Sequence, residues 1–370
     1  MIFNTPFKPP LELNRFPHDK RELLQAWDSA DELILKHLSE VELPEGLKNQ
    51  RILILNDQFG ALSCSLEGFD ISAYTDSYVS FKAIQLNSQG RIQALTRLQE
   101  LRGIYDLVLI RIPKNMSFFE DMLCHLGAHL SPVSKIICGY MVKHQAKAAF
   151  ELLNQTIGET RTSLARRKAR LIFADFQRAG TESPYPKQVS LDSFEIPFTH
   201  HSNLFSREKL DIGTRFLLDH IPKGNYQVVL DLGCANGVIG IAAKKLNPSA
   251  KIIFSDESNM AIQSAATNYG KYFSDPKARA EFLWTNCYED QAPGSVDLVI
   301  CNPPFHQGST RCDSIAWQMF TDSHRALVAG GTLRVIGNTH LQYQTTLKKL
   351  FGNSRIVATN QKFTIVDAVK

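Results

Sequence analysis

The 370-residue sequence predicts an α/β protein made of two tandem domains that arose by duplication. In the second half, an apolar run at 228–232 leads through spaced glycines into an apolar helix start, as in a strand–loop–helix unit of a parallel sheet. A second apolar strand follows at 296–301. Both patterns also occur, in the same order, in the first half of the chain. We therefore expect two Rossmann-like domains, at 1–183 and 187–370, of which the N-terminal one is degenerate.

The composition indicates a globular protein with a mildly basic surface. Hydrophobic residues make up 44% of the chain, and the formal net charge is +4. The 7 cysteines include no C-x-x-C pair, which argues against a zinc site and a disulfide framework. Residues 1–10 contain no apolar signal core, and no apolar run is long enough to span a membrane. We expect a cytoplasmic monomer without metal or membrane partners.

The N-terminal region begins with a short strand or arm at 11–17, followed by a helix at 23–38. We assign Trp27 to the core. The expected apolar face of the helix consists of Leu24, Trp27, Ala30, Leu33, Ile34 and Leu38.

The glycine loop after strand 228–232 predicts a nucleotide-like cofactor. Glycines allow a sharp turn and a close approach, and a helix N-terminus favours a negatively charged ligand group. The dinucleotide fingerprint needs a glycine where Ala235 stands, so that motif is absent. Asp231 instead suits a cofactor with an α-amino group, such as S-adenosylmethionine. For this stretch alone, an ordinary strand-to-helix turn is an equal alternative.

The motif Asn302, Pro303, Pro304 and Phe305 directly follows strand 296–301. Two prolines cannot continue a central strand, so the chain leaves the sheet here. Together with the glycine loop, this motif resembles the class I methyltransferases that methylate an exocyclic nitrogen on a planar group. The Asn302 side-chain oxygen and the Pro303 carbonyl can each accept one amine N–H, and Phe305 can stack on the base. The prolines keep the loop rigid. We assign Cys301 to the core, not to nucleophilic catalysis.

Further strand ends supply the remaining cofactor contacts. Asp256 ends strand 251–256, where a carboxylate can bond both ribose hydroxyls; a surface cap is the alternative. Asn286 can meet the adenine amino group, although asparagine is also common in turns. A segment around Phe205, before a helix at 216–220, is expected beside the methionine end, and His200 and His201 are expected on the surface. The expected cofactor-binding residues are Asp231, Gly233, Cys234, Gly237, Asp256, Glu257, Asn286, Cys287 and Phe205.

The first half repeats this design without its chemistry. Residues 51–63 align without gaps to 228–240, and 105–114 to 296–305, while Asp76 falls near the place of Asp256. Chance similarity between two α/β halves is the alternative, and three landmarks in the same order make duplication the better interpretation. Ile54 replaces the acid, Asn56 replaces the first glycine, and Arg111 with its neighbours replaces Asn-Pro-Pro-Phe. We expect this half to bind neither cofactor nor target amine.

A basic stretch lies near the end of the first half. Its five cations form either a solvated face or a contact to RNA phosphates. They are Arg161, Arg166, Arg167, Lys168 and Arg170. Residues 180–186 are the expected interdomain linker.

Nearly the whole chain is similar to the bacterial ribosomal RNA guanine-N2 methyltransferases with a duplicated class I methyltransferase fold, most closely to their large-subunit branch. The resemblance implies S-adenosylmethionine as cofactor, an RNA-binding first half, and a guanine N2 of naked or partly assembled 23S rRNA as substrate. Ala235 replaces a usual glycine, and Thr339 stands where an arginine is expected. The matching stretches are 15–17, 24–28, 55–63, 168–171, 205–206, 210–213, 302–307 and 347–353.

Other functions remain open from the residues alone. Asn-Pro-Pro-aromatic serves any planar amide-like nitrogen, so 16S rRNA guanine-N2, adenine-N6 and protein glutamine methylation are alternatives. A non-catalytic rRNA-binding assembly factor is the alternative from another class. The intact Asp231, Asp256 and Asn302 argue against it.

Overall fold

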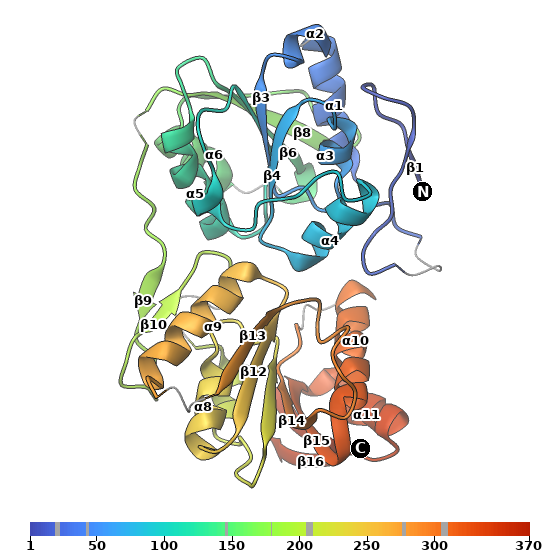
Figure 1. The fold of residues 1–370 in the computed structure, drawn as a ribbon, viewed down its shortest axis with the longest axis vertical. Helices are drawn as coiled ribbons and strands as arrows, with labels where there is room; N and C mark the ends of the chain where they lie inside the picture. The colour runs from blue at the N-terminus through green and yellow to red at the C-terminus, as the bar shows by residue number, and fades with distance from the viewer. Residues whose placement is uncertain are drawn as a thin grey trace. The chain divides into compact units, whose positions relative to one another are not determined.

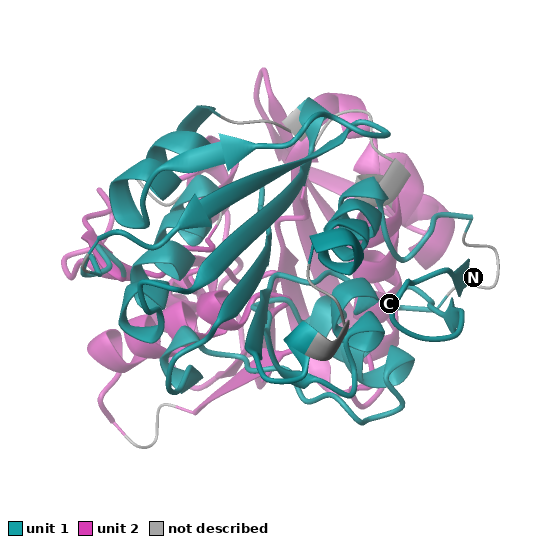
Figure 2. Ribbon diagram, turned by 90° about the horizontal axis from the view of Figure 1, so that it is seen from above, with its two compact units in different colours: residues 1–185 teal, residues 186–370 magenta. Residues whose placement is uncertain are grey.

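The computed structural model describes residues 1–18, 23–41, 44–144, 147–178, 180–204, 210–275, 279–304 and 310–370. The chain forms two compact units, 1–185 and 186–370, which Figure 2 shows in different colours. Each unit has one mainly parallel sheet with helices on both faces (Figure 1). None of the helices described is long and apolar enough to cross a membrane.

Unit 1 contains a sheet with the strand order β4-β3-β5-β6-β8-β7, in which β7 and β8 are antiparallel. A two-stranded arm precedes it, and Ser183 and Tyr185 bond to helix α5 at the end of the unit. The elements are β1 Ile2–Phe3, β2 Leu11–Glu12, α1 Ser29–Val41, α2 Pro44–Leu47, β3 Arg51–Leu55, α3 Ala61–Ser65, β4 Asp70–Tyr74, α4 Tyr78–Asn87, β5 Leu107–Arg111, α5 Met116–Leu126, β6 Lys135–Met141, α6 Lys147–Thr156, β7 Thr160–Thr162 and β8 Ala169–Asp175.

The prediction that the first helix begins at Leu23 was wrong. Helix α1 begins at Ser29, and Leu23 and Leu24 are 88% and 57% exposed. The start is fixed by Asp28, whose Oδ1 accepts a hydrogen bond from the Ala30 amide at 2.8 Å, as an N-cap does. The core position of Trp27 is confirmed.

Unit 2 contains a sheet with the strand order β13-β12-β11-β14-β15-β17-β16, where β17 is antiparallel to its neighbours. Alternate strand side chains pack against α7, α8 and α9 on one face and against α10 and α11 on the other. The elements are β9 Lys187–Val189, β10 Phe198–His200, α7 Ile212–Leu218, β11 Val228–Leu232, α8 Val238–Leu246, β12 Lys251–Asp256, α9 Asn259–Tyr272, β13 Ala280–Trp284, β14 Val296–Cys301, α10 Thr310–Ala326, β15 Leu327–Asn338, α11 Tyr343–Phe351, β16 Arg355–Thr359 and β17 Phe363–Val369.

The two sheets share one strand register, as the sequence alignment requires. Ile52 faces Leu107 across β3 and β5, and the aligned Val229 faces Leu298 across β11 and β14. In unit 1 the outermost parallel strand is reduced to a single bridge, at Leu95. The predicted tandem α/β fold is thus confirmed, and the same three strand ends can be compared between the units.

Candidate active site

The predicted site residues of unit 2 gather at the carboxyl ends of three neighbouring parallel strands, β12, β11 and β14. Asp256 ends β12, the glycine loop follows β11, and Asn302 follows β14. Ligands of open α/β sheets bind outside these ends, where the strand order reverses. Here the order reverses between β11 and β14, so the fold brings the loop and Asn302 to one place.

The glycine loop is held in left-handed turns by its surroundings. Gly233 and Gly237 have φ of 76° and 80°, and Gly237 precedes α8. A Cβ at Gly237 would lie 3.1 Å from the Ala265 Cα, a close contact that would require helix α9 to shift. Ala235 has φ of 48°, a conformation that costs an L-residue roughly 1–2 kcal/mol. Ala235 therefore stores strain in the loop.

Asp231 is buried and ties the loop to the helix that follows. Its Oδ2 accepts a hydrogen bond from the Gly240 amide at 2.8 Å. Its Oδ1 is also buried and has no hydrogen-bond partner among the described residues. Burial raises the pKa of Asp231 to about 7, and the negative charge of Asp256 adds to the effect, against the Gly240 hydrogen bond. An unpaired acceptor of this kind suits a cationic donor such as an ammonium group.

Asp256 joins the loop to the next turn. Its Oδ2 accepts from the Ala235 amide and its Oδ1 from the Ser258 amide, each at 2.9 Å. Burial raises the pKa of Asp256, and these amides oppose the rise. Because each carboxylate oxygen has a second lone pair, Asp256 can accept further hydrogen bonds from a ligand.

The other predicted cofactor-binding residues within the described ranges are buried or make hydrogen bonds inside unit 2. The Glu257 carbonyl accepts from the Trp284 indole at 2.9 Å. Asn286 is buried; its Nδ2 donates to Glu289 at 3.0 Å, and its Oδ1 accepts from the Cys287 thiol at 3.8 Å. The Cys287 carbonyl accepts from the Ser255 hydroxyl, and Cys234 is buried. Phe205 lies outside the described residues.

Asn302 presents a buried acceptor. Its Nδ2 donates to the Thr214 hydroxyl of α7 at 3.0 Å, while its Oδ1 is buried and has no partner within the described ranges. Pro303 is buried and Pro304 exposed, whereas Phe305 lies outside the described residues. The core position of Cys301 is confirmed. Helix α7 begins at Ile212, not at the predicted Phe216, because Asp211 caps it and its side chain accepts from the Thr214 amide at 3.0 Å.

The expectation that His200 is a surface residue was wrong. It ends β10, is 2% exposed, and its Nε2 accepts a hydrogen bond from the Asn236 amide at 2.8 Å. Asn236 lies in the glycine loop, and its carbonyl accepts from Asn268 of α9 at 3.0 Å. The β9–β10 hairpin therefore contacts the glycine loop through His200 and helps to hold Asn236 in place. No local sequence signal marks this contact.

In unit 1, the Asp57 side chain binds the backbone amides of the loop that is equivalent to the glycine loop. Asp57 stands where Cys234 aligns; its Oδ1 accepts from the Gly60 amide at 3.1 Å and its Oδ2 from the Ser63 amide at 2.8 Å. Ser63 aligns with Gly240. The backbone amide at this helix position is bound by the strand residue Asp231 in unit 2 and by the loop residue Asp57 in unit 1. Both oxygens of Asp57 are thus satisfied by the protein.

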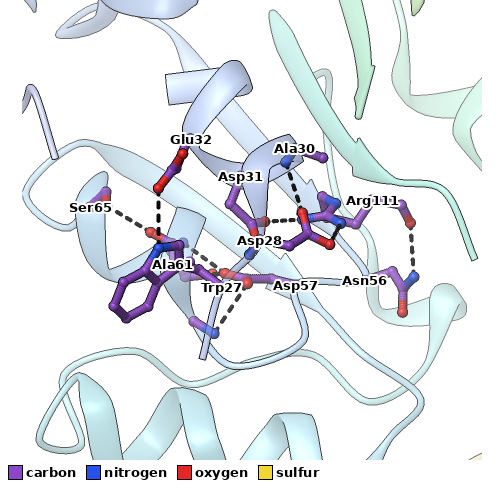
Figure 3. A network of polar contacts seen from close by, with 12 residues as sticks. Trp27, Asp28, Ala30, Asp31, Glu32, Asn56, Asp57, Ala61, Ser65 and Arg111 are labelled. Carbon is purple, nitrogen blue, oxygen red and sulfur yellow. Dashed lines mark hydrogen bonds and ion pairs between the residues drawn. The ribbon is translucent and has the colours of Figure 1, made fainter. Parts of the chain in front are cut away.

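The strand end that carries Asn302 in unit 2 carries Arg111 in unit 1. Figure 3 shows the Arg111 guanidinium between two carboxylates, Asp28 at 2.9 Å and Asp31. Both Arg111 and Asp31 are buried. In the same view, Asn56 donates to the Arg111 carbonyl at 2.8 Å. An internal ion pair therefore occupies the position of the amine acceptor.

The third strand end also differs between the units. Tyr74 of β4 holds the register position of Ser255, so the residue equivalent to Asp256 is Thr75, and Asp76 is equivalent to Glu257. Asp76 therefore falls near the place of Asp256, as predicted, one residue further along the chain. Unit 1 thus lacks a carboxylate at this position.

The residues of unit 2 fit S-adenosylmethionine, and those of unit 1 do not. Unit 2 combines a glycine loop with two buried acceptor atoms that have no partner among the described residues, Asp231 Oδ1 and Asn302 Oδ1. In unit 1, Asp57 and Arg111 use the equivalent space for internal bonds. No group of three or more metal-ligating side chains occurs in the described part of the chain.

Comparison with known proteins agrees with this division. The profile described as "RLMG N-terminal domain" matches residues 2–178, and "Methyltransferase small domain" matches residues 195–367. A protein named Ribosomal RNA large subunit methyltransferase G from Psychromonas ingrahamii is 42% identical over 369 residues, covering 97% of each chain. The chain belongs to the ribosomal RNA large subunit methyltransferase G family.

Other relatives extend the similarity over the full length. The methyltransferase G protein of Stutzerimonas stutzeri is 41% identical and covers 100% of this chain and 99% of its own. A solved T. thermophilus structure, a 16S rRNA N2 methyltransferase (RsmC) in complex with AdoMet and guanosine, has a TM-score of 0.78. It covers 100% of this chain and 97% of its own at 18% identity, so it supports the tandem fold.

Proposed function

We propose that this protein transfers a methyl group from S-adenosylmethionine to the exocyclic N2 of a guanine in 23S rRNA. The observation that carries the proposal is a pair of buried oxygens with no partner in the described part of the chain: Asn302 Oδ1, directly after β14, and Asp231 Oδ1, on the strand before the glycine loop. The names of the relatives supply the substrate class. We place the reaction in the cytoplasm, where 23S rRNA is assembled.

Each half of the proposed site has a separate task. Asp231 and Asp256, with the loop amides, hold S-adenosylmethionine, which supplies an activated methyl group when bound. Asn302 Oδ1 accepts one N–H of the guanine amine, and the Pro303 carbonyl accepts the other. Holding both protons turns the nitrogen lone pair away from the ring system, and rate depends on keeping such a near-attack geometry.

Unit 1, we propose, binds RNA and performs no chemistry. Its basic hairpin β7–β8 turns at Arg167 and Lys168, which have φ of 47° and 64°. Arg161 pairs with Asp175 at 2.9 Å and Arg167 with Glu32 at 3.1 Å, so their charges are partly neutralised within the unit. Arg166 and Lys168 are exposed at the hairpin tip and are the better candidates for phosphate contacts.

Single-turnover methylation with labelled cofactor tests the chemistry. The substrates are deproteinised 23S rRNA, 16S rRNA and assembled subunits, followed by identification of the modified nucleoside. Asn302→Ala should lower the rate on 23S rRNA about 10²–10³-fold, by analogy with the loss of one positioned donor in an oxyanion hole. Cofactor affinity should stay near that of the wild type, because the acceptor faces the amine.

Asn302→Asp is the matched variant, since it keeps an acceptor oxygen and removes the amide donor. It should retain more activity than Asn302→Ala. Methylation of 16S rRNA or of adenine would redirect the substrate assignment, and no transfer to any RNA would favour an assembly factor. A double Arg166→Glu and Lys168→Glu variant should weaken rRNA binding and reduce its salt dependence. Unchanged binding would remove the hairpin from the interface.

A further inference from the structure

The side chain of Asn302 is useful only in one of its two amide orientations. To accept an amine proton, Oδ1 must face the substrate, and a rotation by about 180° would present the NH2 group instead. Because the amide oxygen and nitrogen have nearly the same shape, packing alone selects weakly between the two. A hydrogen bond from the protein must make the choice.

Thr214 makes it. Its hydroxyl lies 3.0 Å from Asn302 Nδ2 and 3.5 Å from Asp211 Oδ2. The hydroxyl donates to Asp211 Oδ2, so its proton points away from Asn302 and its oxygen is left to accept. That oxygen can bind Nδ2 but cannot donate to Oδ1. The hydrogen bonds from Asn302 to Thr214 and from Thr214 to Asp211 therefore fix the side-chain amide of Asn302 in the orientation that leaves Oδ1 available to accept from the substrate.

Unit 1 repeats the same arrangement with different residues. Asp28 precedes α1 as Asp211 precedes α7, and Asp31 stands at the helix position of Thr214. Both Asp28 and Asp31 contact Arg111, the equivalent of Asn302. In each unit, the residue three positions after the capping aspartate binds the side chain at the strand end. In unit 1 the Asp31 carboxylate binds the Arg111 guanidinium, and in unit 2 the Thr214 hydroxyl binds the Asn302 amide.

Resting on the proposed function, we propose that Thr214, supported by Asp211, is a positioning residue for methyl transfer that acts through Asn302. In this role Thr214 acts on the target amine only through the Asn302 side chain. Its contribution is to keep the Asn302 oxygen directed at the amine. A contribution of this kind affects the chemical step and leaves cofactor affinity unchanged.

The test uses the full chain, the Asn302→Ala variant introduced above and four further variants. Thr214→Val keeps the shape and removes the hydroxyl, Thr214→Ser restores the hydroxyl, and Thr156→Val is the control. Thr156 is a buried threonine of unit 1 whose hydroxyl donates to a carbonyl of its own helix at 2.6 Å. The fourth variant combines Thr214→Val with Asn302→Ala.

Thr214→Val should lower kcat on naked 23S rRNA roughly 10–100-fold, with the KM for rRNA and the Kd for S-adenosylmethionine within about 2-fold of wild type. Thr214→Ser should recover most of the rate, and Thr156→Val should match wild type. In the Asn302→Ala background, Thr214→Val should add less than about 2-fold, since the two residues act as one unit. A full additional loss in that background, or an unchanged rate in Thr214→Val, would overturn the proposal.

A second readout does not depend on methyl transfer. The side-chain amide signal of Asn302, assigned by its loss in Asn302→Ala, should show slow proton exchange with solvent in the wild type and faster exchange in Thr214→Val. If wild-type protein methylates no RNA but this difference is present, the proposed function fails while the Thr214 contact stands. Equal exchange in both proteins would show that Thr214 does not hold the amide.

Discussion

Asp231→Asn should stabilise the cofactor-free protein above neutral pH. Folding removes the Asp231 carboxylate from water, which raises its pKa from an ordinary 3.8 to about 7. At 1.36 kcal/mol per pH unit, this difference corresponds to about 4 kcal/mol of folding free energy lost when the buried group is ionised. Asparagine keeps an acceptor for the Gly240 amide but buries an unpaired NH2 group, which costs about 1–3 kcal/mol. The net gain above pH 7 is therefore about 1–3 kcal/mol.

The sign depends on pH in a defined way. Below about pH 4, Asp231 is protonated in both the folded and the unfolded chain, and it makes no pH-dependent contribution. Between about pH 4 and pH 7, only the unfolded chain ionises, so the free energy of unfolding of the wild type falls as pH rises. The advantage of Asp231→Asn should grow across this window and then level off.

Urea unfolding of the two proteins, followed by tryptophan fluorescence from about pH 5 to pH 8, measures this difference. Trp284 and Trp317 report on unit 2. A difference that stays constant with pH, or a variant less stable than wild type at pH 8, would refute a buried carboxylate with a raised pKa. Calorimetry supplies a second check. If Asp231 receives the cofactor ammonium, binding should release protons near pH 7 in the wild type and none in the variant.

Three further changes have defined outcomes. Asp256→Ala should weaken S-adenosylmethionine binding by roughly 1–3 kcal/mol through loss of charge-assisted bonds, and equal affinities by calorimetry would remove Asp256 from the site. Ala235→Gly should raise the free energy of unfolding by about 0.5–1 kcal/mol, because relief of the left-handed strain exceeds the entropy that glycine adds to the unfolded chain; a lower Tm would contradict this. Arg111→Met should cost about 3–5 kcal/mol by leaving Asp31 buried without its partner, and adding Asp31→Asn should recover most of that loss; no recovery would show that packing and not charge is lost.

The internal duplication gives these predictions a built-in comparison. Both units keep the left-handed glycine before the helix, at Gly60 and Gly237, and both use a carboxylate to bind the same helix amide. They differ in whether the carboxylate has an oxygen left over. Unit 2 is thus distinguished from unit 1 by acceptor oxygens that have no partner among the described residues.

The sequence by itself determined the strand ends and the residue types placed there. Asp231, Asp256 and Asn302 were located because an apolar run, a glycine loop and a double proline are local patterns, and parallel strands place their carboxyl ends together. The aligned repeats likewise predicted the tandem sheets, and they put other residues at the first-half positions of Asp231, Gly233 and Asn302. Periodicity did not mark helix starts, since the cap residue Asp28 and not the apolar stripe fixes where α1 begins.

Only the tertiary structure decided which polar groups bind one another. Thr214 meets Asn302 across 88 positions of the chain, and His200 meets the glycine loop across 36. In unit 1, Arg111 reaches Asp28 across 83 positions. Such contacts depend on how whole helices and strands pack. The local sequence around a threonine or histidine is the same whether its side chain is solvated or buried. Asp231 Oδ1 and Asn302 Oδ1, which have no partner among the described residues, became visible in the same way, because the partners of a buried acceptor depend on how its neighbours pack.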